Sequence, residues 1–169
     1  TFPKSVGQIP LYYAHKNTGR PLKEGKWFEK FRSNYLDVDN DALYPFGYGL
    51  SYTTFRFSDI TLNRSSIGMD NELVASVTVT NTGDRAGSEV VQLYIRDLVG
   101  SVTRPVKELK GFEKIYLQPN ESRTVRFTIA PEMLKFYNAD LKFVAEPGDF
   151  DVMIGPDSRN VKTARFTLR

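Results

Sequence analysis

Cysteine is absent from this sequence of 169 residues. Its absence excludes disulfide bonds, thiolate metal sites and cysteine nucleophiles. Histidine occurs once, at His15, and a single imidazole without cysteine or further histidine partners does not make a zinc site. We therefore predict no metal and no cofactor, and we expect His15 to lie in a loop or at an interface.

Long apolar runs and clustered charges are also missing. No run approaches the roughly 20 apolar residues that span a bilayer, and no basic start followed by an apolar stretch marks a signal peptide. The net charge is only +3, and the basic residues are scattered, whereas nucleic-acid-binding proteins usually have one basic face. We predict neither a membrane nor a nucleic-acid partner. Because the chain starts at Thr1 rather than at Met, we expect a piece of a longer protein whose targeting signal, if any, lay upstream.

From Phe55 onward the sequence reads as strands separated by turns. Leu73, Ala75, Val77 and Val79 alternate with other residues at the period of a strand that buries one face. About seven short strands are predicted in this way. They lie near Phe55–Leu62, Leu73–Thr80, Val90–Ile95, Glu108–Leu117, Thr124–Ile129, Asp149–Ile154 and Thr163–Leu168.

No long helical period interrupts these strands, so a parallel α/β sheet is disfavoured. The only helical signal in this part is Pro131–Leu134, which predicts one short turn. The predicted fold class is all-β, an immunoglobulin-like or fibronectin type III-like β-sandwich. The cysteine pair of antibody domains is missing, and the only tryptophan, Trp27, lies outside the predicted sandwich. Both observations favour the fibronectin side of the class.

The residues before Phe55 do not have the pattern of a domain. Ile9–Tyr13 predicts one strand, His15–Pro21 predicts a loop, and Leu22–Asn40 has no sustained period. One strand cannot bury both of its faces alone, so we expect the part before Leu43 to be loosely held or laid over the sandwich. We divide the chain into residues 1–21, 22–54 and 55–169.

Acidic residues at Asp37, Asp39 and Asp41 have the opening spacing of a calcium loop. The full pattern requires glycine at its sixth position and glutamate at its twelfth, where this chain has Ala42 and Tyr48. An Asx-rich turn is therefore the preferred interpretation.

Four aromatic residues lie among glycines in the segment Tyr44–Tyr52. Aromatic rings can stack on the apolar faces of sugars, and the glycines allow tight bends. Two interpretations stay open, of which we favour the first: the rings anchor a linker between two domains, or they lie at the rim of a sugar pocket. The candidate residues are Tyr44, Phe46, Tyr48 and Tyr52.

Basic residues around Pro105 form a second candidate contact. Arg104 and Lys107 could meet an anion or a partner domain, although a solvated loop between strands is the simpler interpretation.

Five segments together resemble the C-terminal end of glycoside hydrolase family 3, and in particular the bacterial periplasmic β-glucosidases. They follow in the family's order and cover the chain nearly end to end. The segments are Thr1–Pro10, His15–Pro21, Leu43–Thr54, Val102–Glu113 and Glu146–Gly155.

The resemblance implies a parent protein of three parts. A TIM-like barrel would carry the nucleophilic Asp, a middle α/β sandwich domain would follow, and a fibronectin type III-like domain would close the chain. Residues 1–21 would be a remnant of the last strand of the middle domain, residues 22–54 the crossing segment and residues 55–169 the closing domain. Nucleophile and general acid would both lie upstream of Thr1, so no catalytic residue is assigned to this chain. A periplasmic or secreted location is implied as well.

The first hypothesis of function is therefore a part of a retaining β-glucosidase that removes terminal β-linked glucose from oligosaccharides. The chain itself would brace the middle α/β domain and shape the rim of the pocket, and its partners would be the upstream barrel and α/β sandwich domains of the parent. Retaining chemistry needs two carboxyl groups about 5–5.5 Å apart. Carboxylates such as Asp149 and Asp151 lie on outward strand positions, which is typical of solvated charge. The alternative is a non-catalytic carbohydrate-binding or protein-interaction module, which the aromatic set favours.

Overall fold

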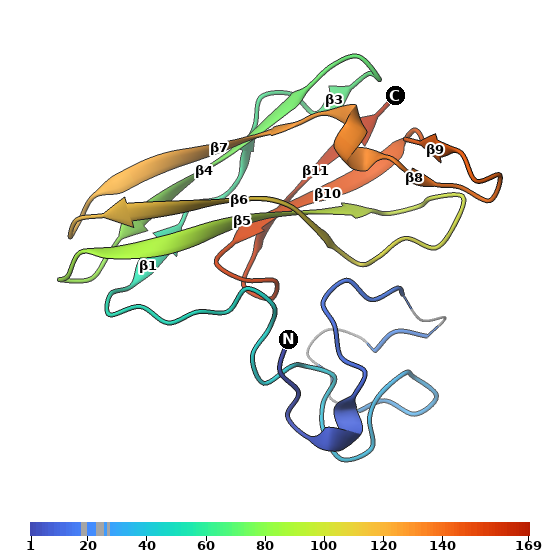
Figure 1. Ribbon diagram of the computed structural model, residues 1–169, viewed down its shortest axis with the longest axis horizontal. Helices are drawn as coiled ribbons and strands as arrows, with labels where there is room; N and C mark the ends of the chain where they lie inside the picture. The colour runs from blue at the N-terminus through green and yellow to red at the C-terminus, as the bar shows by residue number, and fades with distance from the viewer. Residues whose placement is uncertain (18–19, 23–25, 27) are drawn as a thin grey trace.

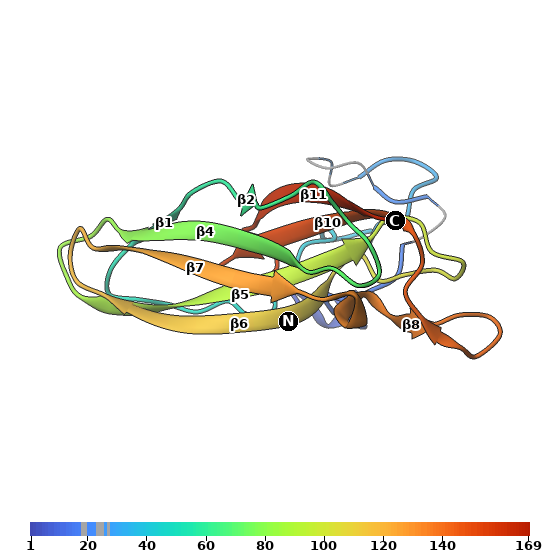
Figure 2. The ribbon, with the colours of Figure 1, turned by 90° about the horizontal axis from the view of Figure 1, so that it is seen from above.

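The computed structural model of the protein describes residues 1–17, 20–22, 26 and 28–169. Residues 55–169 form two facing β-sheets, and the described residues before Tyr44 form a lobe at one side of them (Figures 1 and 2). Trp27, which we predicted to lie outside the sandwich, is outside the described residues. The strands are β1 (Phe55–Phe57), β2 (Thr61–Leu62), β3 (Ser66–Ile67), β4 (Leu73–Asn81), β5 (Gly87–Asp97), β6 (Glu108–Leu117), β7 (Ser122–Ile129), β8 (Phe136–Tyr137), β9 (Phe143–Val144), β10 (Gly148–Gly155) and β11 (Lys162–Leu168), and the 3-10 turns are η1 (Val6–Gln8) and η2 (Pro131–Leu134).

One sheet is built around β4, which pairs antiparallel with β1, β2 and β7. The other sheet contains five strands in the order β3-β11-β10-β5-β6. Its pairs are antiparallel except for β3 with β11, which run parallel. Strands β8 and β9 form a separate hairpin that projects from one end of the molecule (Figures 1 and 2). This arrangement confirms the predicted all-β sandwich, and η2 confirms the predicted turn at Pro131–Leu134.

The core lies between the two sheets and follows the alternation in the sequence. Leu73, Ala75, Val77 and Val79 of β4 are at most 1% exposed. Burying one large apolar side chain contributes about 1.5–3 kcal/mol, so these positions account for much of the stability of the fold. The facing sheet supplies Val91, Leu93, Ile95, Ile115, Leu117, Phe150, Val152, Ile154, Phe166 and Leu168.

Strand β5 is buried on both faces in its middle. Gln92 is 4% exposed and Tyr94 is 0% exposed, although alternation turns both away from the core. Residues outside the sheet cover this face of β5. The Tyr13 ring, for example, lies 5.8 Å from the Tyr94 ring, edge to face. The mixed polarity of Val90–Ile95 in the sequence therefore reflects a second packed face.

The strand predicted at Phe55–Leu62 is wrong as a single element. Residues between Phe57 and Thr61 interrupt it, so that β1 and β2 pair with β4 separately. Ser58 explains the break, since its hydroxyl accepts the Thr78 amide at 2.9 Å and donates to the Asp59 carbonyl at 2.8 Å. Such side-chain bonds compete with a regular ladder.

The strand predicted at Ile9–Tyr13 is also wrong. Pro10 has no N–H to donate, and no described residue pairs alongside this segment as a β-ladder. Strands β3, β8 and β9 were not predicted, because each has only two residues and shows no measurable period.

Polar side chains hold the lobe of the first 43 residues together in its described part. Gln8 is fully buried, accepts the Lys4 amide at 2.7 Å, and donates to the Asp39 and Asp41 carbonyls at 2.9 and 2.8 Å. The Tyr35 hydroxyl donates to the Gln8 carbonyl at 2.7 Å. These bonds satisfy a buried amide and take over part of the role of an apolar core.

Candidate docking surface

The segment Tyr44–Tyr52 turns one of its rings inward, against the sandwich. Phe46 is half-buried and stacks on Tyr13 with ring centroids 4.2 Å apart. The Phe46 carbonyl accepts the Ser158 amide at 2.9 Å, which ties the segment to the turn after β10. Phe46 thus joins the lobe, the segment and the sandwich at a single point.

Gly47 follows with a backbone conformation that other residues rarely adopt, at a φ of +80°. Its carbonyl accepts a hydrogen bond from Gln92 Nε2 at 3.1 Å, and the Tyr94 hydroxyl donates to Gln92 Oε1 at 2.5 Å. Burial raises the pKa of Tyr94, so this hydroxyl stays protonated and keeps its donor role. Gln92 is thereby fixed between the segment and the sheet.

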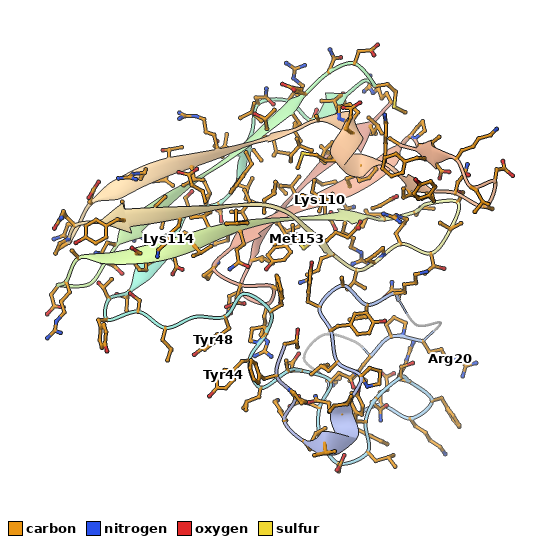
Figure 3. All side chains as sticks on the ribbon, viewed as in Figure 1. Arg20, Tyr44, Tyr48, Lys110, Lys114 and Met153 are labelled. Carbon is orange, nitrogen blue, oxygen red and sulfur yellow. The ribbon has the colours of Figure 1, made fainter. Side chains whose placement is uncertain are left out.

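Tyr44 and Tyr48 project outward from the same segment. Their rings stack with centroids 5.1 Å apart, and the two residues are 45% and 44% exposed. In Figure 3 both side chains leave the segment on one side and point into the open angle beneath the sandwich. Tyr52 is 92% exposed and has no ring neighbour among the described residues.

Strand β6 adds a further exposed ring. Phe112 is 68% exposed and lies opposite Gln92 in the ladder of β5 and β6, and Gln92 contacts Gly47. We call Tyr44, Tyr48, Tyr52 and Phe112 the aromatic face. Exposed large apolar side chains are typical of a surface that another molecule covers.

A groove of about 410 Å³ runs between residues 47–52 and the start of β5. Glu89 is the only acidic side chain among its lining residues, and burial raises the pKa of its carboxyl group. A retaining glycosidase needs a pair of carboxyl groups, so this groove lacks the means for that chemistry. Its remaining walls are Gly47, Gly49, Leu50, Ser51, Tyr52, Ala86, Gly87, Ser88, Val90 and Lys114.

The loop that follows β5 holds the lobe at a second place. Arg104 lies 3.6 Å from Asp97 and 2.9 Å from Glu108, and its guanidinium sits over the Phe136 ring at 4.2 Å. With its side chain only 14% exposed, Arg104 is not the solvated residue of our simpler interpretation. Burial raises the pKa of Asp97 even though Arg104 opposes the shift.

The neighbours of Arg104 contact the chain's own lobe. Pro105 bridges to Lys16, and the Val106 amide donates to the His15 carbonyl at 2.9 Å. Lys107 donates to the Ser158 carbonyl, and burial lowers its pKa. His15 is therefore an interface residue through its backbone, while its ring is exposed.

The acidic motif around Asp39 forms a turn, as predicted. Asp39 Oδ1 accepts the Asp41 amide at 2.9 Å, and its carboxylate binds Lys4 Nζ at 2.6 Å. The hydrogen bond from Lys4 lowers the pKa of Asp39. On β10, Asp149 accepts from the Thr167 hydroxyl at 2.7 Å and Asp151 pairs with Arg165 at 2.9 Å.

A family model described as "Fibronectin type III-like domain" matches residues 89–158, from β5 to the turn after β10. Over these residues the sandwich has a fibronectin type III-like fold. The match covers most of β5 and all of β6 to β10, and it leaves out β1 to β4 and β11, which agrees with the predicted fold class.

Over nearly its whole length the chain is also similar to part of several glycosidases. It is 55% identical to the Periplasmic beta-glucosidase of Salmonella typhimurium over 168 residues, which are 99% of this chain and 22% of that protein. It is 47% identical to a Putative beta-xylosidase of Formosa agariphila, with 100% of this chain and 21% of the relative covered. The fibronectin type III-like domain and its preceding residues thus span about a fifth of the length of the relatives they match.

A solved structure extends this likeness to three dimensions. The β-glucosidase from Listeria innocua in complex with isofagomine has a TM-score of 0.93 at 42% identity. The match covers 99% of this chain and 23% of that one, so it includes the lobe as well as the fibronectin type III-like domain.

Sequence reasoning named the aromatic segment but missed the residues that receive it. Tyr13 stacks on Phe46, Gln92 binds the Gly47 carbonyl, and Tyr94 packs against Tyr13. Phe112 extends the exposed aromatic face. The usable signal was the mixed polarity of β5, where Val90 and Tyr94 join Gln92 on the face that a one-sided strand turns to solvent.

Proposed function

We propose that this chain is the C-terminal region of a retaining β-glucosidase of glycoside hydrolase family 3 and that it serves there as a structural, non-catalytic part. The match to about a fifth of the length of β-glucosidases, over nearly all of this chain, carries the proposal. The single carboxyl group in the groove beside the aromatic segment supports the non-catalytic role. The catalytic nucleophile and acid then belong to upstream domains.

The proposed division of the chain is a remnant of the preceding domain at residues 1–21, a crossing segment at residues 22–54 and the fibronectin type III-like domain at residues 55–169. The first regular strand of the described residues begins at Phe55, which supports the last boundary. Upstream barrel and α/β sandwich domains of the parent would be the partners of this part.

The aromatic face is the proposed contact with those upstream domains. Phe46 anchors the segment to Tyr13, whereas Tyr44 and Tyr48 are 45% and 44% exposed and Tyr52 is 92% exposed. An interface of this kind gains most of its energy from a few well-buried aromatic side chains. If the substrate pocket of the parent opens at this junction, the same tyrosines would form part of its rim.

The proposed substrates of the parent are oligosaccharides with terminal β-linked glucose. Relatives named β-glucosidase support glucose, and the relatives from Formosa agariphila are named β-xylosidase, so β-xylosides are the natural competitor substrates to test. A periplasmic or secreted location is proposed from the periplasmic relative of Salmonella typhimurium. None of the helical turns in the described residues is long and apolar enough to cross a membrane.

We expect the purified 169-residue chain to leave an aryl β-glucoside unhydrolysed, because the proposal assigns the nucleophile and the general acid to upstream domains. Release of the aryl group is followed by absorbance, with the complete parent enzyme as the positive control. Steady turnover that co-purifies with the folded chain would place the chemistry within it and refute the proposal.

A further inference from the structure

The β8–β9 hairpin presents an apolar tip that the proposed function does not use. Tyr137 is 66% exposed, Phe143 is 54% exposed and Leu141 is 81% exposed. Figures 1 and 2 both show this hairpin projecting from the end of the sandwich, away from the segment that carries the aromatic face. Exposed rings in such a position do not contribute to the core of the domain.

The two rings lie side by side on one face of the hairpin. Tyr137 and Phe143 are directly paired across β8 and β9, with ring centroids 5.0 Å apart and planes tilted by 43°. Their strand neighbours Phe136 and Val144 point to the other face, where Phe136 is only 4% exposed and lies under Arg104. The hairpin thus buries Phe136 on one face and exposes Tyr137 and Phe143 on the other.

Hydrogen bonds make the tip rigid. Asn138 Oδ1 accepts the amides of Asp140 and Lys142, both at 3.0 Å, and the Asn138 amide donates to the Lys142 carbonyl at 3.1 Å. The Leu141 amide closes the turn on the Asn138 carbonyl at 3.0 Å. A preorganised pair of rings loses little conformational entropy when a ligand covers it.

We infer that the β8–β9 hairpin is an accessory binding site for β-linked glucan chains. Sugar rings present apolar C–H faces that pack on aromatic side chains, and a cross-strand pair of rings can follow successive sugars of an extended chain. The Tyr137 hydroxyl supplies a hydrogen-bonding group at the edge of its ring. This inference rests on the proposed function, since a β-glucosidase works on such chains.

Binding at this position would hold a polymeric substrate close to the enzyme. A second, weak site on the same molecule raises the effective concentration of the ligand without any new contact in the catalytic pocket. The site would therefore act on polymers and long oligosaccharides and leave the hydrolysis of a short aryl glucoside unchanged.

Electrophoresis of the 169-residue chain in native gels containing soluble mixed-linkage β-glucan tests this site. We expect the glucan to slow the wild-type chain and to leave the double variant Tyr137→Ala/Phe143→Ala nearly unaffected, with apparent affinity about tenfold lower. Tyr116→Ala, which removes a ring that is 53% exposed on β6, is the matched control and should be slowed like the wild type. A wild-type chain that migrates freely in glucan, or a double variant that is slowed as much as the wild type, overturns the inference.

A second measurement avoids any risk that the double variant fails to fold. Aromatic NMR signals of the wild-type chain are followed while cellohexaose is added. Signals of Tyr137 and Phe143 should move with the sugar while those of Tyr116 stay in place. Unchanged signals of both hairpin rings would refute the site, and they would not bear on the aryl glucoside test of the proposed function.

Discussion

Replacing Phe150 with alanine is expected to lower the free energy of unfolding by about 3–5 kcal/mol. Phe150 is 1% exposed and stacks on Phe166 with centroids 5.4 Å apart. It lies on β10, in the middle of the five-stranded sheet, where it pairs with Asp97 on β5 and Phe166 on β11. Removing the ring leaves a cavity between β5, β10 and β11. The side chains on these three strands cannot all move in to fill it.

Urea unfolding of the 169-residue chain, followed by circular dichroism, measures this loss. Phe112→Ala removes the same side chain from a position that is 68% exposed and should cost less than about 1 kcal/mol. Equal losses for the two variants would mean that the two sheets do not enclose Phe150 as described.

Gly47→Ala is expected to lower the free energy of unfolding by roughly 2–4 kcal/mol. A φ of +80° is strained for any residue with a Cβ atom, and a Cβ placed there would lie 2.0 Å from Gln92 Oε1. Gln92 would have to move, which breaks its bonds to the Gly47 carbonyl and to the Tyr94 hydroxyl in a buried position.

Gly49→Ala is the matched control for this substitution. Gly49 has ordinary φ, and nothing lies within 4 Å of a Cβ added to it. Its stability should stay within about 0.5 kcal/mol of the wild type, or rise slightly because the unfolded chain loses freedom. Should Gly47→Ala prove as neutral as Gly49→Ala, the segment would not be seated on β5 in solution.

Most of the sandwich could be predicted from the sequence, because apolar and polar residues alternate along its longer strands. Strands such as β4 bury one face only, so Leu73, Ala75, Val77 and Val79 alternate with residues on the outer face of the sheet. Where the chain is short or held by side chains, as at Ser58 or in β8 and β9, the period does not reveal the element. The strand predicted at Ile9–Tyr13 is wrong for another reason. An apolar run becomes a strand only when a neighbouring strand completes its hydrogen bonds.

The aromatic segment was found from composition, but the orientation of each ring was not. Phe46 turns inward and Tyr48 outward because Gly47 between them adopts a positive φ and is held by Gln92, which lies 45 residues further along the chain. A contact over that separation leaves no pattern in the aromatic segment itself. In β5 it leaves only the mixed polarity of Val90, Gln92 and Tyr94 on the face away from the core.

Hydrogen exchange in the longer parent enzyme, compared with the isolated 169-residue chain, tests most directly whether the aromatic face is a docking surface for upstream domains. Amides from Tyr48 to Tyr52 should exchange markedly more slowly in the parent, because its upstream domains cover them. Those in the β8–β9 hairpin, at Tyr137 to Phe143, should exchange at the same rate in both. Equal exchange of residues 48–52 in the two proteins would contradict the proposed docking role.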